Sequence, residues 1–194
     1  MAGRPKIFSE KEVIDKAIEV FWRVGYEAAS AEELLKAMGI GKGSFYLAFK
    51  GGKRELFERS LVQFSAERLA NLKRAISVSD NPIQLIKDFF LSIADTGLAK
   101  HMNGCYLGNA IAEMANIDAA LQNIAINLLK EMEVVFTSVI RQAQDDQELK
   151  STEKPDILAR YLINLWNGIN ISRRMYTDKF MLKEMISFQL QVIK

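Results

Sequence analysis

The 194-residue sequence contains one cysteine, one histidine and three prolines, and each shortage excludes a class of protein. A single cysteine cannot form an internal disulfide, which is typical of a protein from a reducing compartment. One cysteine and one histidine are too few for a zinc finger or another Cys/His-rich metal cluster, so we expect no metal and no cofactor. Few prolines and only 11 glycines argue against a collagen-like or turn-dense all-β chain.

The sequence also lacks long apolar runs and the usual motifs of enzymes. No window of about 18 uncharged apolar residues occurs, so we expect no transmembrane helix. The N-terminal segment MAGRPKIFSEKE has no apolar signal-peptide core, so we expect a cytoplasmic protein. There is no glycine-rich phosphate loop after a strand, no metal-ligand spacing and no Ser-His-Asp order. An enzyme is therefore the less favoured class, although the globular composition alone would allow one.

The first third of the chain predicts three helices separated by glycine turns. Ser9 opens the first, since Glu12 completes the capping-box spacing, and Gly25 ends it. Ser30 opens a second, short helix that ends at Gly39. A third short helix follows at 42–49, before Gly51 and Gly52 break the chain again.

From Lys53 onward the apolar periodicity predicts longer helices. The expected elements are 53–76, a helix capped by Asn81 with Pro82 in its first turn, a short helix at 105–115, a long one from Asp118 through Ile140, one from Pro155 through Ile169, and a last one capped by Thr177 or Asp178. We therefore predict an all-α protein of about nine helices. It divides near residue 53, between a part with short helices and glycine turns at 1–52 and a part with long helices at 53–194.

Two short helices joined by a tight glycine turn and preceded by a packing helix make a helix-turn-helix. A helix about 10–12 Å wide fits the roughly 12 Å major groove of B-DNA. Small residues are needed where the backbone approaches DNA, and Gly41, Gly43 and Ser44 supply them. Lys42 and Lys50 bracket the second helix of the pair with positive charge. The segment 36–59 is also the main basic concentration of the chain, although such a cluster is more often simply a solvated face.

The residues SAEELLKAMGIGKGSFYLAF at 30–49 resemble the DNA-binding signature of tetracycline-repressor (TetR) family regulators. The segments at 17–26 and 53–57 are similar to that family's first helix and to the start of its fourth, so the family-type domain is about 7–66. The resemblance implies that 1–52 is an N-terminal arm with a helix-turn-helix DNA-binding domain and that 53–194 is a helical regulatory and dimerisation domain. The resemblance implies a homodimer that represses transcription from double-stranded operator DNA and releases it when a small-molecule effector reaches the C-terminal helices. Activation is an alternative, because polarity depends on where the operator lies relative to a promoter.

The resemblance also implies roles for individual residues. Lys42 and Ser44 would face base edges; Ser30, Tyr46 and Lys53 would bind phosphates; and Phe45 would be buried. One extra residue precedes Lys53 relative to the family's spacing, so Lys50 or Arg54 is an alternative to it. Arg4 and Lys6 form a basic arm that enters a minor groove or contributes only nonspecific charge. The expected DNA-binding residues are Arg4, Lys6, Ser30, Ala31, Gly41, Lys42, Gly43, Ser44, Tyr46, Lys50 and Lys53.

For the effector we expect a cavity with apolar walls and a few polar groups. The candidate residues are Phe89, Phe90, Met102, Tyr106, Asn109, Glu113, Phe136, Trp166 and Asn170. The two asparagines and the glutamate are the orienting groups in this set, because a polar group on an apolar stripe is costly unless it is paired. Cys105 is an alternative input as a redox-sensing thiol, or with His101 and Met102 as a soft-metal site, against the simpler reading of a small buried apolar residue.

The last helix carries two apolar stripes, 181/185/188/192 and 182/186/190/193, so we expect one to cover the core and the other to contact a second copy of the chain. Together with the stripe at 158–169, it would form a four-helix interface across a twofold axis. The expected interface residues are Leu158, Leu162, Leu165, Met181, Met185 and Phe188. The alternative is that the stripe containing Leu182 and Ile186 faces the partner.

Overall fold

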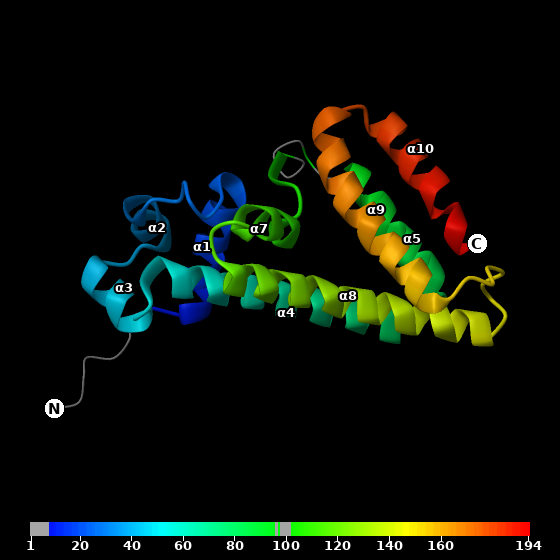
Figure 1. Cartoon of the computed structure of the whole chain (residues 1–194), viewed down its shortest axis with the longest axis horizontal. Helices are drawn as coiled ribbons and strands as arrows, with labels where there is room; N and C mark the ends of the chain where they lie inside the picture. The colour runs from blue at the N-terminus through cyan, green and yellow to red at the C-terminus, as the bar shows by residue number, and fades with distance from the viewer. Residues whose placement is uncertain (1–7, 96, 98–101) are drawn as a thin grey trace. The chain divides into compact units, whose positions relative to one another are not determined.

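A computed structural model describes residues 8–95, 97 and 102–194 of the chain (Figure 1). Within these residues there are nine α-helices, two 3₁₀ helices and no strand, which confirms the all-α prediction. The elements are α1 (Glu10–Val24), α2 (Ala31–Met38), α3 (Lys42–Ala48), α4 (Gly52–Ser77), α5 (Pro82–Leu91), η1 (Ser92–Asp95), α7 (Tyr106–Met114), α8 (Ala119–Asp145), α9 (Pro155–Met175), α10 (Lys179–Gln189) and η2 (Leu190–Ile193).

Local side-chain chemistry sets most of the helix starts. The hydroxyl of Ser9 accepts a hydrogen bond from the Glu12 backbone N–H, and Ser30 accepts one from Glu33. Asn81 caps α5 and Asp178 caps α10 in the same way. Each cap satisfies a backbone donor that has no partner inside its helix, so these predicted starts are confirmed.

Several helix bounds differ from the sequence prediction, and α8 and α9 continue beyond their apolar stripes to Asp145 and Met175. The helix α7 begins at Tyr106, so Cys105 stands just before it rather than within it. The helix α5 ends at Leu91 and continues as the 3₁₀ turn η1. Helices commonly tighten into 3₁₀ geometry in their last turn, and apolar periodicity does not register that change.

The described residues form two compact units. Unit 1 contains those of 1–67 together with 109–128, and unit 2 contains those of 68–108 together with 129–194. The predicted boundary after residue 52 does not coincide with this division. One reason is that α4 begins at Gly52, at the predicted boundary, and its first half places Leu56, Phe57 and Leu61 in the core of unit 1.

The core of unit 1 is built around aromatic rings. Phe57 packs edge-on against Phe21 with ring centroids 4.9 Å apart, and Tyr26 lies 4.9 Å from the same ring. Leu34 and Met38 of α2 are buried as well. These contacts fix α1 on α4, and α2 packs against α1, which is the support that a helix-turn-helix requires.

The core of unit 2 is one hydrophobic cluster drawn from several helices. It includes Phe90 of α5, Phe136 of α8, Leu162 of α9 and Ile186 of α10, each with 0% of its surface exposed. The helix α10 packs against both α5 and α9 (Figure 1). No helix in the described part of the chain is long and apolar enough to cross a membrane.

Candidate nucleic-acid interface and regulatory site

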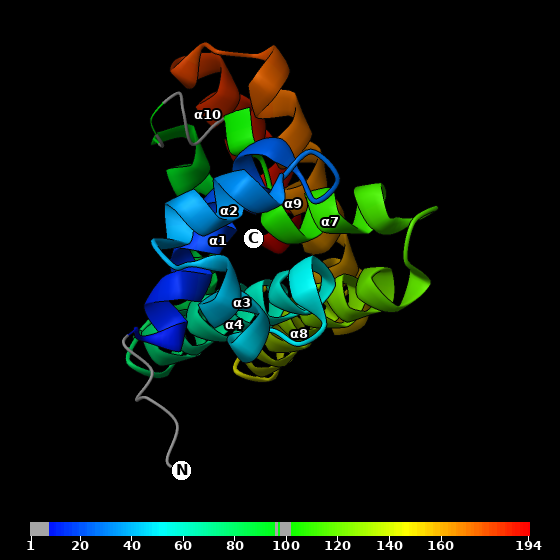
Figure 2. The same ribbon diagram turned by 90° about the vertical axis from the view of Figure 1, so that its left-hand side faces the viewer.

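The first turn of α3, the helix that lies toward the viewer in Figure 2, is exposed to solvent. Lys42, Gly43 and Ser44 at its start are all exposed, and no other group lies within 4 Å of where a side-chain carbon on Gly41 or Gly43 would sit. Gly41 caps the helix without a side-chain hydrogen bond, and the first turn contains no acidic residue. A second molecule can therefore approach the backbone of the first turn of α3 closely, and the positive charge of Lys42 lies beside that point of approach.

Aromatic packing holds α3 in place. Phe45 is 6% exposed, which confirms that it is buried, and its ring lies 5.4 Å from that of Phe49. Tyr46 is half exposed and its ring meets Phe45 edge-on at 5.1 Å. The Tyr46 ring is thereby supported on one side, while half of its surface remains available to a ligand.

The other predicted DNA-binding residues lie around this face or outside the described residues. Ser30 and Ala31 are exposed at the start of α2, and the Ser30 hydroxyl already accepts the Glu33 N–H at 3.1 Å. Lys50 is exposed in the turn after α3. Arg4 and Lys6 lie outside the described residues.

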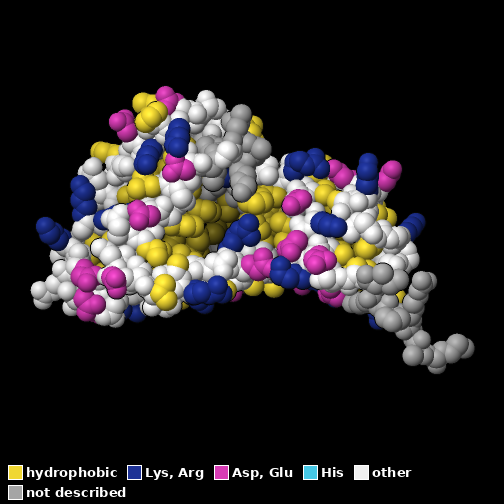
Figure 3. All heavy atoms as spheres, turned by 180° about the vertical axis from the view of Figure 1, so that it is seen from behind, with side chains coloured by type: hydrophobic (Ala, Val, Ile, Leu, Met, Phe, Trp, Pro, Cys, Tyr) yellow, Lys and Arg dark blue, Asp and Glu magenta, His cyan; other side chains and the backbone are white. Residues whose placement is uncertain are grey.

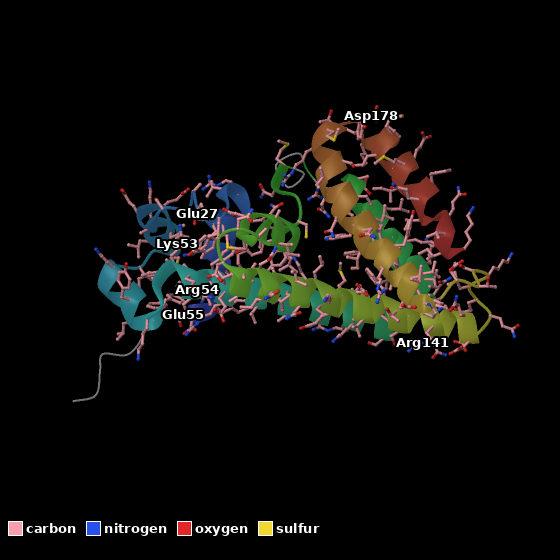
Figure 4. The ribbon with its side chains drawn as sticks, viewed as in Figure 1. Glu27, Lys53, Arg54, Glu55, Arg141 and Asp178 are labelled. Carbon is pink, nitrogen blue, oxygen red and sulfur yellow. The ribbon has the colours of Figure 1, made fainter. Side chains whose placement is uncertain are left out.

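Lys53 is engaged within unit 1. Its ammonium donates to the backbone carbonyls of Ala29 at 3.1 Å and Glu27 at 3.3 Å, and it lies 4.5 Å from the centroid of the Tyr26 ring (Figure 4). These contacts tie the start of α4 to the connection between α1 and α2. A phosphate contact would have to use the remaining N–H of the same ammonium, so the predicted phosphate role stays a prediction.

The segment 109–128 makes two polar attachments to the helix-turn-helix inside unit 1. Both carboxylate oxygens of Glu113 accept backbone N–H groups, from Tyr26 and from Glu27, each at 2.9 Å. Arg54 donates to Asp118 at 2.7 and 3.4 Å, and the guanidinium holds the pKa of that carboxyl below its usual value. Spacing along the sequence could not have indicated either attachment, because the partners lie more than 60 residues apart.

The place of Glu113 corrects one sequence prediction. We expected its carboxylate to orient an effector, but both oxygens are occupied by the Tyr26 and Glu27 amides. Asn109 belongs with it to unit 1, whereas the other predicted effector residues belong to unit 2. The polar group on the apolar stripe of α7 is thus paired within the protein, which is the commoner fate of such groups.

The predicted effector residues of unit 2 form an aromatic cluster. Phe89 stacks on Trp166 with ring centroids 5.1 Å apart and planes 11° apart, and Phe90 meets the same indole edge-on. Phe90, Phe136 and Tyr106 are almost fully buried, whereas Met102 is 55% exposed. Asn170 is buried and its amide donates to the Trp166 carbonyl at 2.8 Å.

Cys105 lies beside this cluster and is 8% exposed. Its sulfur accepts hydrogen bonds from the Trp166 indole N–H at 3.1 Å and from the Gly108 backbone N–H at 3.3 Å. The second contact makes the thiol a cap for the start of α7. His101, its partner in the soft-metal alternative, lies outside the described residues.

Two polar residues near Cys105 are absent from our sequence prediction. Arg173 is buried and donates to the Gly104 carbonyl at 2.9 Å, and burial lowers the pKa of its guanidinium. The side-chain oxygen of Asn167 is buried without a hydrogen-bond partner in the described structure. Arg173 lies four residues beyond Ile169 on the apolar stripe of α9, and a charged residue at that position is the signal that could have found it.

The outer surfaces of α9 and α10 correct the predicted dimer interface. Leu158, Leu162 and Leu165 are at most 6% exposed and pack in the core of their own unit, so they offer little surface to a second chain. A helix must first cover its own core, and this stripe of α9 does so. On α10 the stripe containing Leu182 and Ile186 is also buried.

The opposite stripe of α10 is exposed. Met181 and Phe188 are 62% and 73% exposed, and Met185 is partly buried. Met185 also lines a groove of about 240 Å³ between α9 and α10, together with Tyr161, Gly168 and Gln189. On the face drawn in Figure 3, Lys and Arg lie among Asp and Glu with no broad area of one sign, and hydrophobic side chains are in view there as well. The outward stripe of α10 is thus an exposed apolar surface of unit 2.

Comparison with known proteins assigns both parts of the chain. Residues 13–59 match the family described as bacterial regulatory proteins, tetR family, and residues 84–188 match the tetracyclin repressor-like C-terminal domain. The uncharacterised HTH-type regulator YezE of Bacillus subtilis is 29% identical over 197 residues, covering 98% of this chain and 99% of its own. The HTH-type transcriptional repressor DhaR of Mycobacterium sp. (strain GP1) is 22% identical, covering 94% and 91%.

The fold is also that of a solved protein–DNA complex. The TetR-family regulator CifR, solved as a cysteine mutant with 26-base-pair operator DNA, superposes with a TM-score of 0.82 at 21% identity. The match covers 99% of this chain and 100% of that one.

Proposed function

Because the chain belongs to the tetR family of bacterial regulatory proteins, we propose that it is a homodimeric repressor that binds a palindromic operator through α3 and leaves it when a small effector binds in unit 2. The chain is a DNA-binding transcriptional regulator, and family members act as homodimers with small-molecule effectors. The name of its relative DhaR supports repression over activation. We further propose regulation rather than catalysis as its activity, and the cytoplasm, where operator DNA is accessible, as its location.

The exposed face of α3 carries the DNA-binding part of the proposal. Lys42 and Ser44 offer hydrogen-bonding groups to base edges, and bare backbone at Gly43 lets the helix sit deep in the major groove. The exposed Tyr46, Ser30 and Lys50 would hold phosphates and fix the position of the helix. A helix of this width fits the groove, whereas the buried face with Phe45 stays on the protein.

For the dimer, we propose the outward stripe of α10, with Met181, Met185 and Phe188, together with the groove beside it. Exposed apolar side chains gathered on one face are costly in water, and a second copy of the chain removes them from it. Twofold symmetry of the protein would then match twofold symmetry of the DNA, with half-sites about 34–36 Å or a multiple apart.

For the effector, we propose a small, mostly apolar molecule bound at the aromatic cluster of unit 2. Phe89 and Trp166 supply apolar surface, and Asn170 and the unpartnered oxygen of Asn167 supply orientation. The effector would bind more tightly to the dimer that cannot engage DNA, so by linkage the operator weakens effector binding by the same factor. A thiol sensor at Cys105 is the less favoured reading, because the sulfur is buried and caps α7.

Selection of DNA from a random library tests the proposal. We expect an enriched inverted repeat, and affinity that falls by orders of magnitude as salt rises from about 50 to 200 mM, because phosphate contacts release counterions. Lys42→Ala should change the preferred bases, whereas the matched control Lys150→Ala, an exposed charge in unit 2, should change neither preference nor affinity. Selection without an inverted repeat would contradict the proposal.

A further inference from the structure

We propose that Leu47 reads the methyl group of a thymine in each half of the operator. The inference rests on the proposed function, since it requires α3 to enter the major groove. Leu47 is 74% exposed, although it belongs to a helix of only seven residues whose Phe45 is 6% exposed. The sequence prediction did not include Leu47 among the DNA-binding residues.

The position of Leu47 in the helix places it among the groups that would face the bases. Residues four apart lie on the same side of a helix, so Leu47 lies one turn beyond Gly43 and beside Ser44. Gly43 has open space where a side chain would be, which leaves the approach to Leu47 unobstructed from that side. An isolated exposed leucine is ordinary on a protein surface, but this one shares a face with the exposed Gly43 and Ser44.

The chemistry of the major groove narrows what Leu47 can contact. Base edges there present hydrogen-bond donors and acceptors, and one apolar group, the 5-methyl of thymine. An isobutyl group placed over a donor or an acceptor would remove water without replacing its hydrogen bond, which is unfavourable. Placed over the methyl group, it buries apolar surface on both molecules. Leu47 is therefore complementary to thymine and to no other unmodified base.

The packing beneath α3 makes such a contact selective. The rings of Phe45 and Phe49 lie 5.4 Å apart, and the Tyr46 ring rests edge-on against Phe45. The backbone that carries Leu47 is therefore anchored on both sides of residue 47. A side chain on an anchored backbone can reach few base steps, whereas one on a mobile backbone could reach several.

Deoxyuridine substitution tests the proposal, because it removes only the methyl group of thymine. Each thymine of the selected operator is replaced in turn, and the dissociation constant is measured by fluorescence anisotropy. For the wild type we expect one position per half-site where the replacement weakens binding about fourfold, the effect of one buried methyl group. Leu47→Ala should bind the unmodified operator more weakly and be indifferent to deoxyuridine at that position.

A matched control and a reverse substitution complete the test. Ile117→Ala shortens an aliphatic side chain that is 50% exposed outside α3, and it should keep the wild-type response to deoxyuridine. Replacing the same thymine with cytosine should weaken wild-type binding, and 5-methylcytosine should recover part of the loss. If the wild type binds a salt-sensitive inverted repeat but no deoxyuridine substitution distinguishes it from Leu47→Ala, the assignment of Leu47 is wrong while the proposed function stands. If no DNA is bound, both are wrong.

Discussion

The attachment of Glu113 to the connection between α1 and α2 gives a prediction that can be worked out from the structure. Glu113→Ala removes an acceptor from two backbone N–H groups, those of Tyr26 and Glu27, each now bonded at 2.9 Å. A hydrogen bond to a charged group contributes roughly 1.5–3 kcal/mol. Glu113 is partly exposed, so water replaces part of the loss, and we expect a net destabilisation of about 2–3 kcal/mol.

Two measurements follow from that magnitude. For a chain of this length we expect the apparent Tm to fall by roughly 5–10 °C. The amides of Tyr26 and Glu27 should exchange faster with solvent than in the wild type, because their acceptor is gone. Glu131→Ala, which removes an exposed carboxylate from α8, is the matched control and should change the Tm little. Unchanged exchange at both amides in Glu113→Ala would refute the reasoning.

Three further predictions concern the dimer, the thiol and pH. Met185→Glu combined with Phe188→Glu should give a folded monomer of 22.0 kDa by light scattering and abolish operator binding, since buried unpaired charges are costly; a folded variant that remains dimeric would contradict the proposed interface. Cys105→Ser should keep operator binding and effector response, because a hydroxyl can also cap α7; loss of the response to an oxidant or electrophile would favour the thiol sensor instead. Asp118→Asn keeps a capping oxygen but loses the charge pair with Arg54. Because the folded-state pKa of Asp118 is lowered, the stability that this carboxylate contributes is present above about pH 3.8 and is lost as the pH falls through the folded-state pKa. The difference in Tm between wild type and variant should therefore be present at pH 7 and shrink toward pH 3, and a difference that did not shrink would contradict this origin.

The starts of the helices were predictable from sequence because capping is local. Each capping side chain accepts a backbone N–H from a residue two or three positions ahead, so a few consecutive residues are enough to predict its role. The four capping residues are Ser9, Ser30, Asn81 and Asp178. The motif at 30–49 is equally local, which is why the amino-acid sequence by itself indicated the helix-turn-helix and the burial of Phe45. Apolar spacing likewise indicated long helices after residue 53.

Tertiary structure alone decided which partner each nonlocal group found. Glu113 reads as an unpaired polar residue on an apolar stripe, yet its acceptors are filled by amides 86 and 87 residues away. The stripe with Leu158 and Leu162 and the stripe with Met181 and Phe188 are both apolar, but only the second faces outward. Periodicity reports that a helix has an apolar face and not what covers it, because burial depends on where the other helices pack.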